Sequence, residues 1–171
     1  MRVVSGELRG RRIESPAGDV TRPTTDKVRE AVFNALGSAG ILDGATVLDL
    51  FAGTGAMGIE ALSRGAARCV FVERDRNALV ALRRNVESLG LGSRSEIVQG
   101  DALAAVSREA DILIADPPYG FGGWDDLVVR ARAPFLVLEA DVPVPAPEGW
   151  ETVRERRYGR THVTFLARAT G

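Results

Sequence analysis

Asp116, Pro117, Pro118 and Tyr119 follow the apolar run DILIA, and their residue types suit chemistry on a flat amine. Each proline ring fixes φ and removes an amide donor, and each X–Pro bond keeps the preceding residue extended. The Pro117 carbonyl therefore lacks local donors, and both it and the Asp116 carboxylate can accept from a flat –NH2 group. Tyr119 offers a ring on which a nucleobase can stack. A stiff turn with a surface tyrosine is the alternative interpretation.

The exocyclic amine of a nucleobase is a poor nucleophile because its lone pair is delocalised into the ring. Acceptors on its two hydrogens favour a pyramidal nitrogen and orient the lone pair toward an electrophile. The pattern therefore predicts methylation of such an amine, with Asp116 as the candidate to take up the proton. The base must leave its stack to reach this site.

A glycine-rich turn supplies the second candidate group of residues. The stretch VLDLFAGTGAMG places Gly53, Gly55 and Gly58 in a G-x-G-x-x-G pattern between a predicted strand and a predicted helix. That pattern is typical of dinucleotide-binding folds, where the turn meets a pyrophosphate. Asp49, at the end of the strand, would repel a pyrophosphate and attract a cation. S-adenosylmethionine carries an ammonium and a sulfonium group and no phosphate, so the pattern favours this cofactor.

Two further acids follow the next two predicted strands. Glu73 ends the second strand, where a carboxylate can accept both ribose hydroxyls. Asp101 follows the third, where its side chain or the Ala102 backbone can meet an adenine amino group. Open α/β sheets bind ligands at the edge where their strands end. Helix capping is the alternative role for such acids.

The elements that would hold these residues follow from apolar periodicity. Strands are predicted at 45–51, 68–73, 95–99, 111–115 and 134–140, and helices at about 24–37, 56–65 and 75–90. Strands that alternate with helices indicate an α/β fold with a parallel, doubly wound sheet. Segments 150–159 and 161–168 predict an antiparallel hairpin that completes it. MRVVSG and GRRIESP predict a small N-terminal β-hairpin.

Length and composition indicate one soluble globular domain. The chain has 171 residues, of which 45% are hydrophobic, and no apolar run approaches the ~20 residues that span a bilayer. The N-terminus lacks the apolar region of a secretory signal, so a cytoplasmic protein is expected. The single cysteine, Cys69, excludes an intramolecular disulfide and a multi-cysteine metal site, and it is expected in the core.

Charge is distributed unevenly. The net charge is −1, yet residues 1–42 carry +2, residues 43–148 carry −6 and residues 149–171 carry +3. Basic ends indicate a polyanionic partner. We expect the N-terminal arginines to bind RNA phosphates and the C-terminal arginines to be solvated surface residues. The N-terminal set comprises Arg2, Arg9, Arg11, Arg12 and Arg22. Phe121 and Trp124 are expected either to stack on RNA or to pack in the core.

The motifs VLDLFAGTGAMGIEAL, FVERD, GDAL and ADPPY resemble, in order, those of class I S-adenosylmethionine-dependent methyltransferases. The flanks RGRRI, RPTTDKVREAVFNAL, LSRGA and YGRTHVTFL resemble the RsmD family of bacterial 16S ribosomal-RNA guanine-N2 methyltransferases. The resemblance implies a Rossmann-like, mostly parallel seven-stranded sheet. It also implies a small-subunit particle as substrate, with a hairpin-loop guanine as the target.

The resemblance also implies roles for particular residues. Asp116, Pro117 and Tyr119 match the positions that bind the target amine. The candidate cofactor positions are Asp49, Phe51, Gly53, Gly55, Glu73, Arg74, Asp101 and Ala102. The chain departs from the family in one place, because only about fifteen residues separate Tyr119 from the next strand. A reduced wall of the target pocket is therefore expected.

Other functions remain open at this stage. A DNA adenine-N6 methyltransferase shares the DPPY motif, but it would usually need an added recognition domain. A non-catalytic Rossmann-like nucleotide-binding module is the alternative outside enzymes. We expect a monomer with a single methyltransferase domain, in which an N-terminal extension (residues 1–23) precedes a catalytic core (residues 24–171).

Overall fold

The computed structural model describes residues 1–16 and 25–170. Its strands are β1 (Thr46–Leu50), β2 (Arg68–Glu73), β3 (Ser95–Gln99), β4 (Ile112–Ala115), β5 (Phe135–Ala140), β6 (Trp150–Tyr158) and β7 (Thr161–Arg168). Its α-helices are α1 (Asp26–Ser38), α2 (Ala56–Ser63), α3 (Arg76–Ser88), α4 (Ala102–Ala105) and α5 (Trp124–Arg130), with a short 3₁₀ helix, η1 (Gly92–Arg94). In this part of the chain every helix is too short or too polar to cross a bilayer.

The strands form one sheet in the order β3-β2-β1-β4-β5-β7-β6. Strands β3, β2, β1, β4 and β5 are parallel, and β7 pairs antiparallel with both β5 and β6. This arrangement confirms the predicted α/β class, with a mostly parallel seven-stranded sheet and a C-terminal antiparallel hairpin. The order reverses between β1 and β4, which is where open α/β sheets form their ligand crevice.

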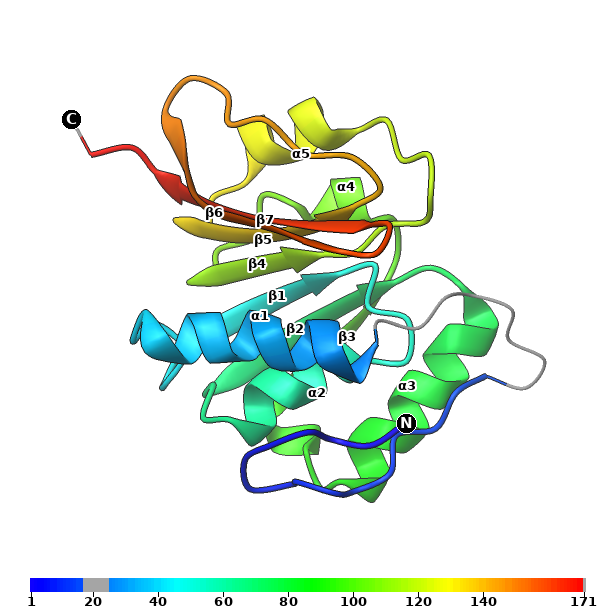
Figure 1. Cartoon of the computed structure of the whole chain (residues 1–171). Coiled ribbons are helices and arrows are strands. Elements are labelled where there is room, and N and C mark those ends of the chain that lie inside the picture. The colour runs from blue at the N-terminus through cyan, green and yellow to red at the C-terminus, as the bar shows by residue number, and fades with distance from the viewer. Residues whose placement is uncertain (17–24, 171) are drawn as a thin grey trace.

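Helices cover both faces of the sheet (Figure 1). Helices α1, α2 and α3 pack on one face, against side chains such as Phe71, Ile114 and Val137. Helices α4 and α5 pack on the other face, against the alternate strand residues, including Leu48, Leu113 and Leu138. The central strands are buried on both faces, as expected for parallel strands between two helical layers. Cys69 lies in the first of these cores with its side chain fully buried, as predicted.

Helix α2 approaches the sheet closely because glycine occupies two positions. Gly55, at the N-cap, has φ +88°, a left-handed conformation that other residues adopt only with strain. A Cβ at Gly58 would lie 2.3 Å from the ring of Phe71. The glycine pattern therefore serves helix packing as well as the turn itself.

Three features differ from the sequence-based expectations. The short helices α4 and α5 were not predicted, because four and seven residues are too few to show a helical period. The predicted N-terminal β-hairpin contains no strands. Its two arms meet through a single antiparallel bridge between Arg2 and Arg12. Helix α1 begins at Asp26, after the N-cap Thr25, whose hydroxyl accepts from the Val28 amide.

The N-terminal segment is attached to α2 by side chains of that helix. The buried carboxylate of Glu60 accepts from the amides of Val4 (2.9 Å) and Ser5 (3.0 Å). The same carboxylate accepts from Nε of the fully buried Arg29 at 3.1 Å and from Nε of Arg64 at 2.8 Å. A buried ion pair thus holds the segment against the helical layer.

Candidate active site

The predicted acids gather at the carboxyl edge of the sheet. Asp49 lies in β1, Glu73 ends β2, Asp101 follows β3 and Asp116 follows β4. These four strands are adjacent in the order β3-β2-β1-β4, and all of them are parallel. The structure therefore brings together at one edge the carboxylates that the sequence places 15 to 28 residues apart.

Asp49 is the buried member of this group, with 3% of its surface exposed. Its Oδ2 accepts from the Gly58 amide at 3.0 Å, so the carboxylate sits against the start of α2. Burial raises the pKa of Asp49 to about 8, the Gly58 hydrogen bond opposes this shift, and the negative charges of Asp116 and Glu73 add to it. Burial and the charges of Asp116 and Glu73 both disfavour the ionised form of Asp49. A cation beside this carboxylate would offset both of these effects.

Glu73 holds the glycine turn in place. Its Oε1 accepts from the Gly53 amide at 2.8 Å, and its Oε2 accepts from the amides of Arg74 and Asp75, each at 2.8 Å. The sequence suggested ligand binding or helix capping as the role of this carboxylate. The amides it accepts from are backbone groups, which no side-chain pattern reveals. Because a carboxylate has about four acceptor positions, Glu73 retains capacity for a ligand hydroxyl.

Phe51 has the only positive φ among the described non-glycine residues, at +58°. For an aromatic residue this conformation is an outlier, and such strain is concentrated at functional sites. The Phe51 ring packs edge-on against Phe121 at 5.2 Å, and Phe121 packs in the same way against Trp124 at 5.1 Å. These ring contacts connect the glycine turn to the segment after Tyr119. They agree with the second of the two expectations for Phe121 and Trp124, that these residues pack within the protein.

The remaining candidate cofactor residues lie at the same edge. Asp101 is exposed and occupies the N-cap of α4, but its side chain makes no capping hydrogen bond. Helix capping therefore does not account for this carboxylate. Ala102 follows it and is buried against the sheet, and Arg74 is exposed next to Glu73. Gly53 has φ +58° with open space on its side-chain face.

The Asp-Pro-Pro-Tyr segment leaves the sheet directly after β4. Asp116 and Pro117 are half-buried, whereas Pro118 and Tyr119 are exposed, with 56% of the tyrosine surface accessible. Asp116 is close enough to Asp49 for its charge to raise the pKa of that carboxyl. The two predicted groups, one for a cofactor and one for an amine, thus meet at the β1–β4 junction.

The predicted RNA-binding arginines lie elsewhere. Arg2, Arg9, Arg11 and Arg12 are exposed on the N-terminal segment, and Arg22 lies outside the described residues. Glu7 in that segment pairs with Arg94 just before β3, and Arg11 donates to the carbonyl of Ser88 at the end of α3. These contacts place residues 7–11 toward the amino edge of the sheet, opposite the acids.

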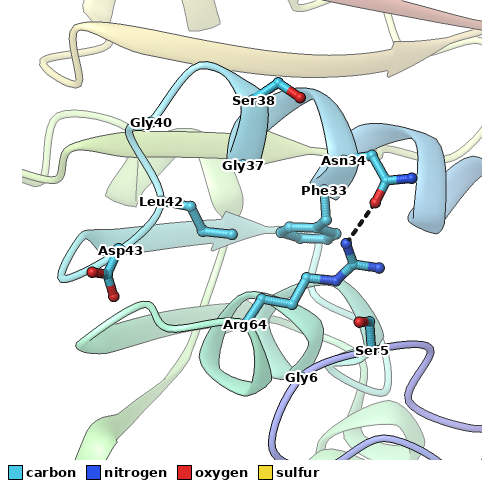
Figure 2. Close-up of a pocket in the computed structure, with 10 residues that line it drawn as sticks. All are labelled: Ser5, Gly6, Phe33, Asn34, Gly37, Ser38, Gly40, Leu42, Asp43 and Arg64. Atoms are coloured by element: carbon cyan, nitrogen blue, oxygen red, sulfur yellow. Dashed lines mark hydrogen bonds between the residues drawn. The ribbon is translucent and has the colours of Figure 1, made fainter.

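A hollow of about 740 Å³ also lies near that opposite edge, between α1, α2 and the loop that precedes β1 (Figure 2). Phe33, Asn34, Leu42, Asp43 and Arg64 contribute to its lining. The Arg64 guanidinium points to Asn34, to which it donates at 3.0 Å, and it also pairs with Glu60. The hollow is separate from the acid-lined edge, and the arginine that lines it has partners within the protein.

The acid-lined edge suits a cationic ligand better than a dinucleotide. Among the residues that the structure describes, no arginine or lysine forms an ion pair with Asp49, Glu73 or Asp101. A desolvated carboxylate with like-charged neighbours disfavours a pyrophosphate and favours a cationic ligand.

The fold and the arrangement of this edge define a Rossmann-like methyltransferase. The profile of the family described as Conserved hypothetical protein 95 matches residues 1–167. The chain belongs to this family, that of the RsmD methyltransferases.

Individual relatives agree with this assignment. The candidate rRNA methyltransferase YlbH of Bacillus subtilis is 39% identical over 181 aligned positions, which cover 96% of this chain and 97% of the relative. Ribosomal RNA small subunit methyltransferase D of Escherichia coli K12 is 33% identical over 173 positions, 94% of this chain and 86% of the relative. The solved structure of the candidate methyltransferase yhhF from Escherichia coli has a TM-score of 0.87 and 31% identity. It covers 100% of this chain and 99% of that one.

Proposed function

We propose that the protein transfers a methyl group from S-adenosylmethionine to the exocyclic N2 amine of a guanine in 16S ribosomal RNA. The observation that carries the proposal is the meeting of two groups of residues at the β1–β4 junction. The buried Asp49 carboxylate and its glycine turn lie beside the rigid Asp116–Pro117 acceptors. A relative that matches nearly the whole chain is named a small-subunit ribosomal RNA methyltransferase, which supports the choice of substrate.

The cofactor side of the site uses the residues around the glycine turn. Asp49 faces the positive charge of the ligand, and the backbone at Gly53 and Gly55 permits its close approach. Glu73 accepts from the ribose, with the Arg74 amide holding its carboxylate in place. Phe51 shapes the turn from its strained conformation, while Asp101 and the Ala102 backbone meet the adenine. S-adenosylmethionine supplies a methyl group that its sulfonium makes electrophilic.

The amine side uses two acceptors held by the rigid Asp-Pro-Pro segment. The Asp116 carboxylate and the Pro117 carbonyl accept from the two hydrogens of the guanine amine, which turns its lone pair toward the methyl group. Asp116 takes up the proton that the amine loses. Tyr119 stacks on the base after it has left its helix. Each proline ring fixes φ, which makes the strand end rigid. Proline also supplies a carbonyl acceptor without adding an amide donor.

The same proposal extends to the setting of the reaction. The substrate is a small-subunit particle in the cytoplasm, and the enzyme acts as a monomer with one methyltransferase domain. Residues 1–23 form an extension of the catalytic core, and its arginines contact RNA phosphates. The relatives' names support an RNA substrate.

Mass spectrometry of 16S rRNA from a strain that lacks the gene tests the substrate. We expect one guanine to lose a single N2 methyl group, and expression of the wild-type gene should restore it. The Asp116→Ala variant should not restore it, although calorimetry should show S-adenosylmethionine affinity within a few-fold of wild type. An unchanged modification pattern in the deletion strain refutes the substrate assignment. Tight NAD binding without S-adenosylmethionine binding refutes the cofactor assignment.

A further inference from the structure

The C-terminal hairpin ends at the same edge of the sheet as the candidate active site. Ala115, the last residue of β4, pairs with Leu138 of β5, which pairs with Thr164 of β7. One row further toward the carboxyl edge, Glu139 pairs with Val163, and Val163 pairs with Arg156. The row that passes through Asp116 therefore continues across β5 and β7 to Arg156. Three steps between neighbouring strands span about 14 Å.

The turn between β6 and β7 extends beyond this row. Residues 156–162, which we call the hairpin tip, include Arg156, Arg157 and Arg160 and no acid. All three arginines are exposed, and β6 is the last strand of the sheet, so no other strand covers them. Glu155, just before the tip, lies 3.9 Å from Nδ1 of His162. The tip thus presents three positive charges at the edge where the reaction is proposed to occur.

At the amino edge, arginines in or next to the strands pair with acids, whereas Arg9 and Arg11 of the N-terminal segment have no carboxylate partner among the described residues. At the amino edge, Arg68 and Arg108 both pair with Glu96, Arg94 pairs with Glu7, and Arg132 lies 3.8 Å from Glu109. In the described part of the chain, none of the tip arginines has a carboxylate partner. Within the described residues, Arg156 donates to the neighbouring carbonyl of Glu155 and Arg157 to that of Gly159.

Uncompensated arginines at the reacting edge fit a polyanion that approaches that edge. Guanidinium groups bind phosphate through paired N–H donors and remain charged at any physiological pH. Arg9 and Arg11 lie toward the opposite edge, so the tip is better placed than these two arginines to meet RNA at the reacting edge. The sequence led us to expect the C-terminal arginines to be solvated surface residues, and the structure shows them exposed at the edge where the reaction is proposed to occur.

We propose that the hairpin tip binds backbone phosphates of the RNA strand that carries the target base. The proposal rests on the proposed function and adds a second contact surface to it. Arg156, Arg157 and Arg160 contact phosphates, not base edges, so they contribute affinity and orientation without sequence preference. An RNA strand that places its base at Asp116 continues along the sheet edge toward the tip.

The test compares two variants that each remove three positive charges. One carries Arg156→Ala, Arg157→Ala and Arg160→Ala at the tip. The matched control carries Arg68→Ala, Arg108→Ala and Arg132→Ala at the amino edge. Binding to labelled 16S rRNA and to small subunits from the deletion strain is measured over a range of salt concentrations. Calorimetry with S-adenosylmethionine and thermal unfolding check that both variants are folded.

We expect the tip variant to bind RNA at least tenfold more weakly, with a salt dependence reduced by about two in the log–log slope. Its KM for small subunits should rise by a similar factor, while kcat and S-adenosylmethionine affinity stay within about twofold. The control should change RNA affinity by less than about threefold, because its arginines are already neutralised by carboxylates.

Three outcomes overturn the proposal. If the wild type methylates RNA and the tip variant behaves like the control, the tip inference is wrong and the proposed function stands. If the wild type neither binds nor methylates RNA, the tip inference and the proposed function are both wrong. If sedimentation shows that the tip substitutions dissociate a dimer without changing the RNA affinity of the monomer, the exposed edge serves a second copy of the chain instead.

Discussion

The amide of Gly53 donates to Oε1 of Glu73 at 2.8 Å, so the last residue of β2 holds the turn that follows β1. The other carboxylate oxygen accepts from Arg74 and Asp75, which begin the approach to α3. One side chain therefore fixes two loops relative to each other at the cofactor edge. A residue that binds a ligand hydroxyl and also shapes the neighbouring backbone should be sensitive to a change of one atom.

Glu73→Gln tests this dual role. An amide keeps one acceptor oxygen and replaces the other with a donor, so at least one backbone N–H loses its partner, at a cost of about 1–3 kcal/mol. We expect S-adenosylmethionine affinity, measured by calorimetry, to fall at least tenfold while the fold is retained. Glu87→Gln, on the exposed face of α3, is the matched control and should leave affinity unchanged. Equal affinities in the two variants would contradict the role of Glu73.

Asp49→Asn tests the buried carboxyl through pH. Burial raises the pKa of Asp49 to about 8 in the folded protein, above its ordinary value near 4. The folded state therefore holds this proton more tightly than the unfolded state. The stabilisation is complete below about pH 4 and is lost as pH rises toward 8. Urea unfolding of ligand-free protein should show this decline in the wild type, and the decline should be smaller in Asp49→Asn.

The same substitution makes a prediction about ligand binding. A cationic ligand favours ionised Asp49, so binding releases a proton below about pH 8. Wild-type affinity for S-adenosylmethionine should increase as pH rises through 7 to 8 and then level off. Asp49→Asn should bind more weakly, with little dependence on pH over this range. Affinity that is independent of pH in the wild type would show that the ligand does not meet this carboxylate.

The sequence predicts the sheet well because its central strands are apolar runs bounded by clear turns. Strands 68–73, 95–99 and 161–168 have the observed bounds, and the others differ by one residue at each end at most. The acids at the strand ends are also predictable, because the carboxyl ends of parallel strands meet at one edge. The short helices α4 and α5 are not, since they lack enough residues for a period.

The contacts that hold the site are less predictable than its residues. Glu60 lies in an apolar helix and appears in the sequence as a single charge, yet it organises the N-terminal segment and Arg29. Phe51 has an ordinary residue type, and only the structure reveals its positive φ. Such features depend on backbone groups brought together from distant segments, for which a single sequence carries no periodic signal.

Glu60→Ala should be strongly destabilising. The substitution leaves the fully buried Arg29 guanidinium without its main partner and frees the amides of Val4 and Ser5. Removal of one partner from a buried ion pair costs about 3–5 kcal/mol. Glu96→Ala is the comparison, since it breaks exposed pairs with Arg68 and Arg108 that are worth about 1 kcal/mol or less. Urea unfolding measures both, and similar losses would show that the Glu60 cluster is not a structural centre.

Asn85 links the N-terminal segment to the glycine turn, and its removal should loosen both. This fully buried side chain of α3 donates to the carbonyls of Glu14 (3.0 Å) and Thr54 (2.9 Å), and it accepts from the Glu14 amide at 2.8 Å. Asn85→Ala leaves these backbone groups unpaired, so the free energy of unfolding should fall by about 1–3 kcal/mol.

Hydrogen exchange distinguishes a local link between the N-terminal segment and the glycine turn from a general loss of stability. In Asn85→Ala, the Glu14 amide, which loses its acceptor directly, and the amides of the glycine turn should exchange faster than those of β4 and β5. S-adenosylmethionine should bind more weakly because the turn is less ordered before the ligand arrives. Asn77→Ala, on the exposed face of the same helix, should change neither exchange nor binding. Uniformly faster exchange in Asn85→Ala would instead mean that Asn85 stabilises the whole fold without connecting these two segments.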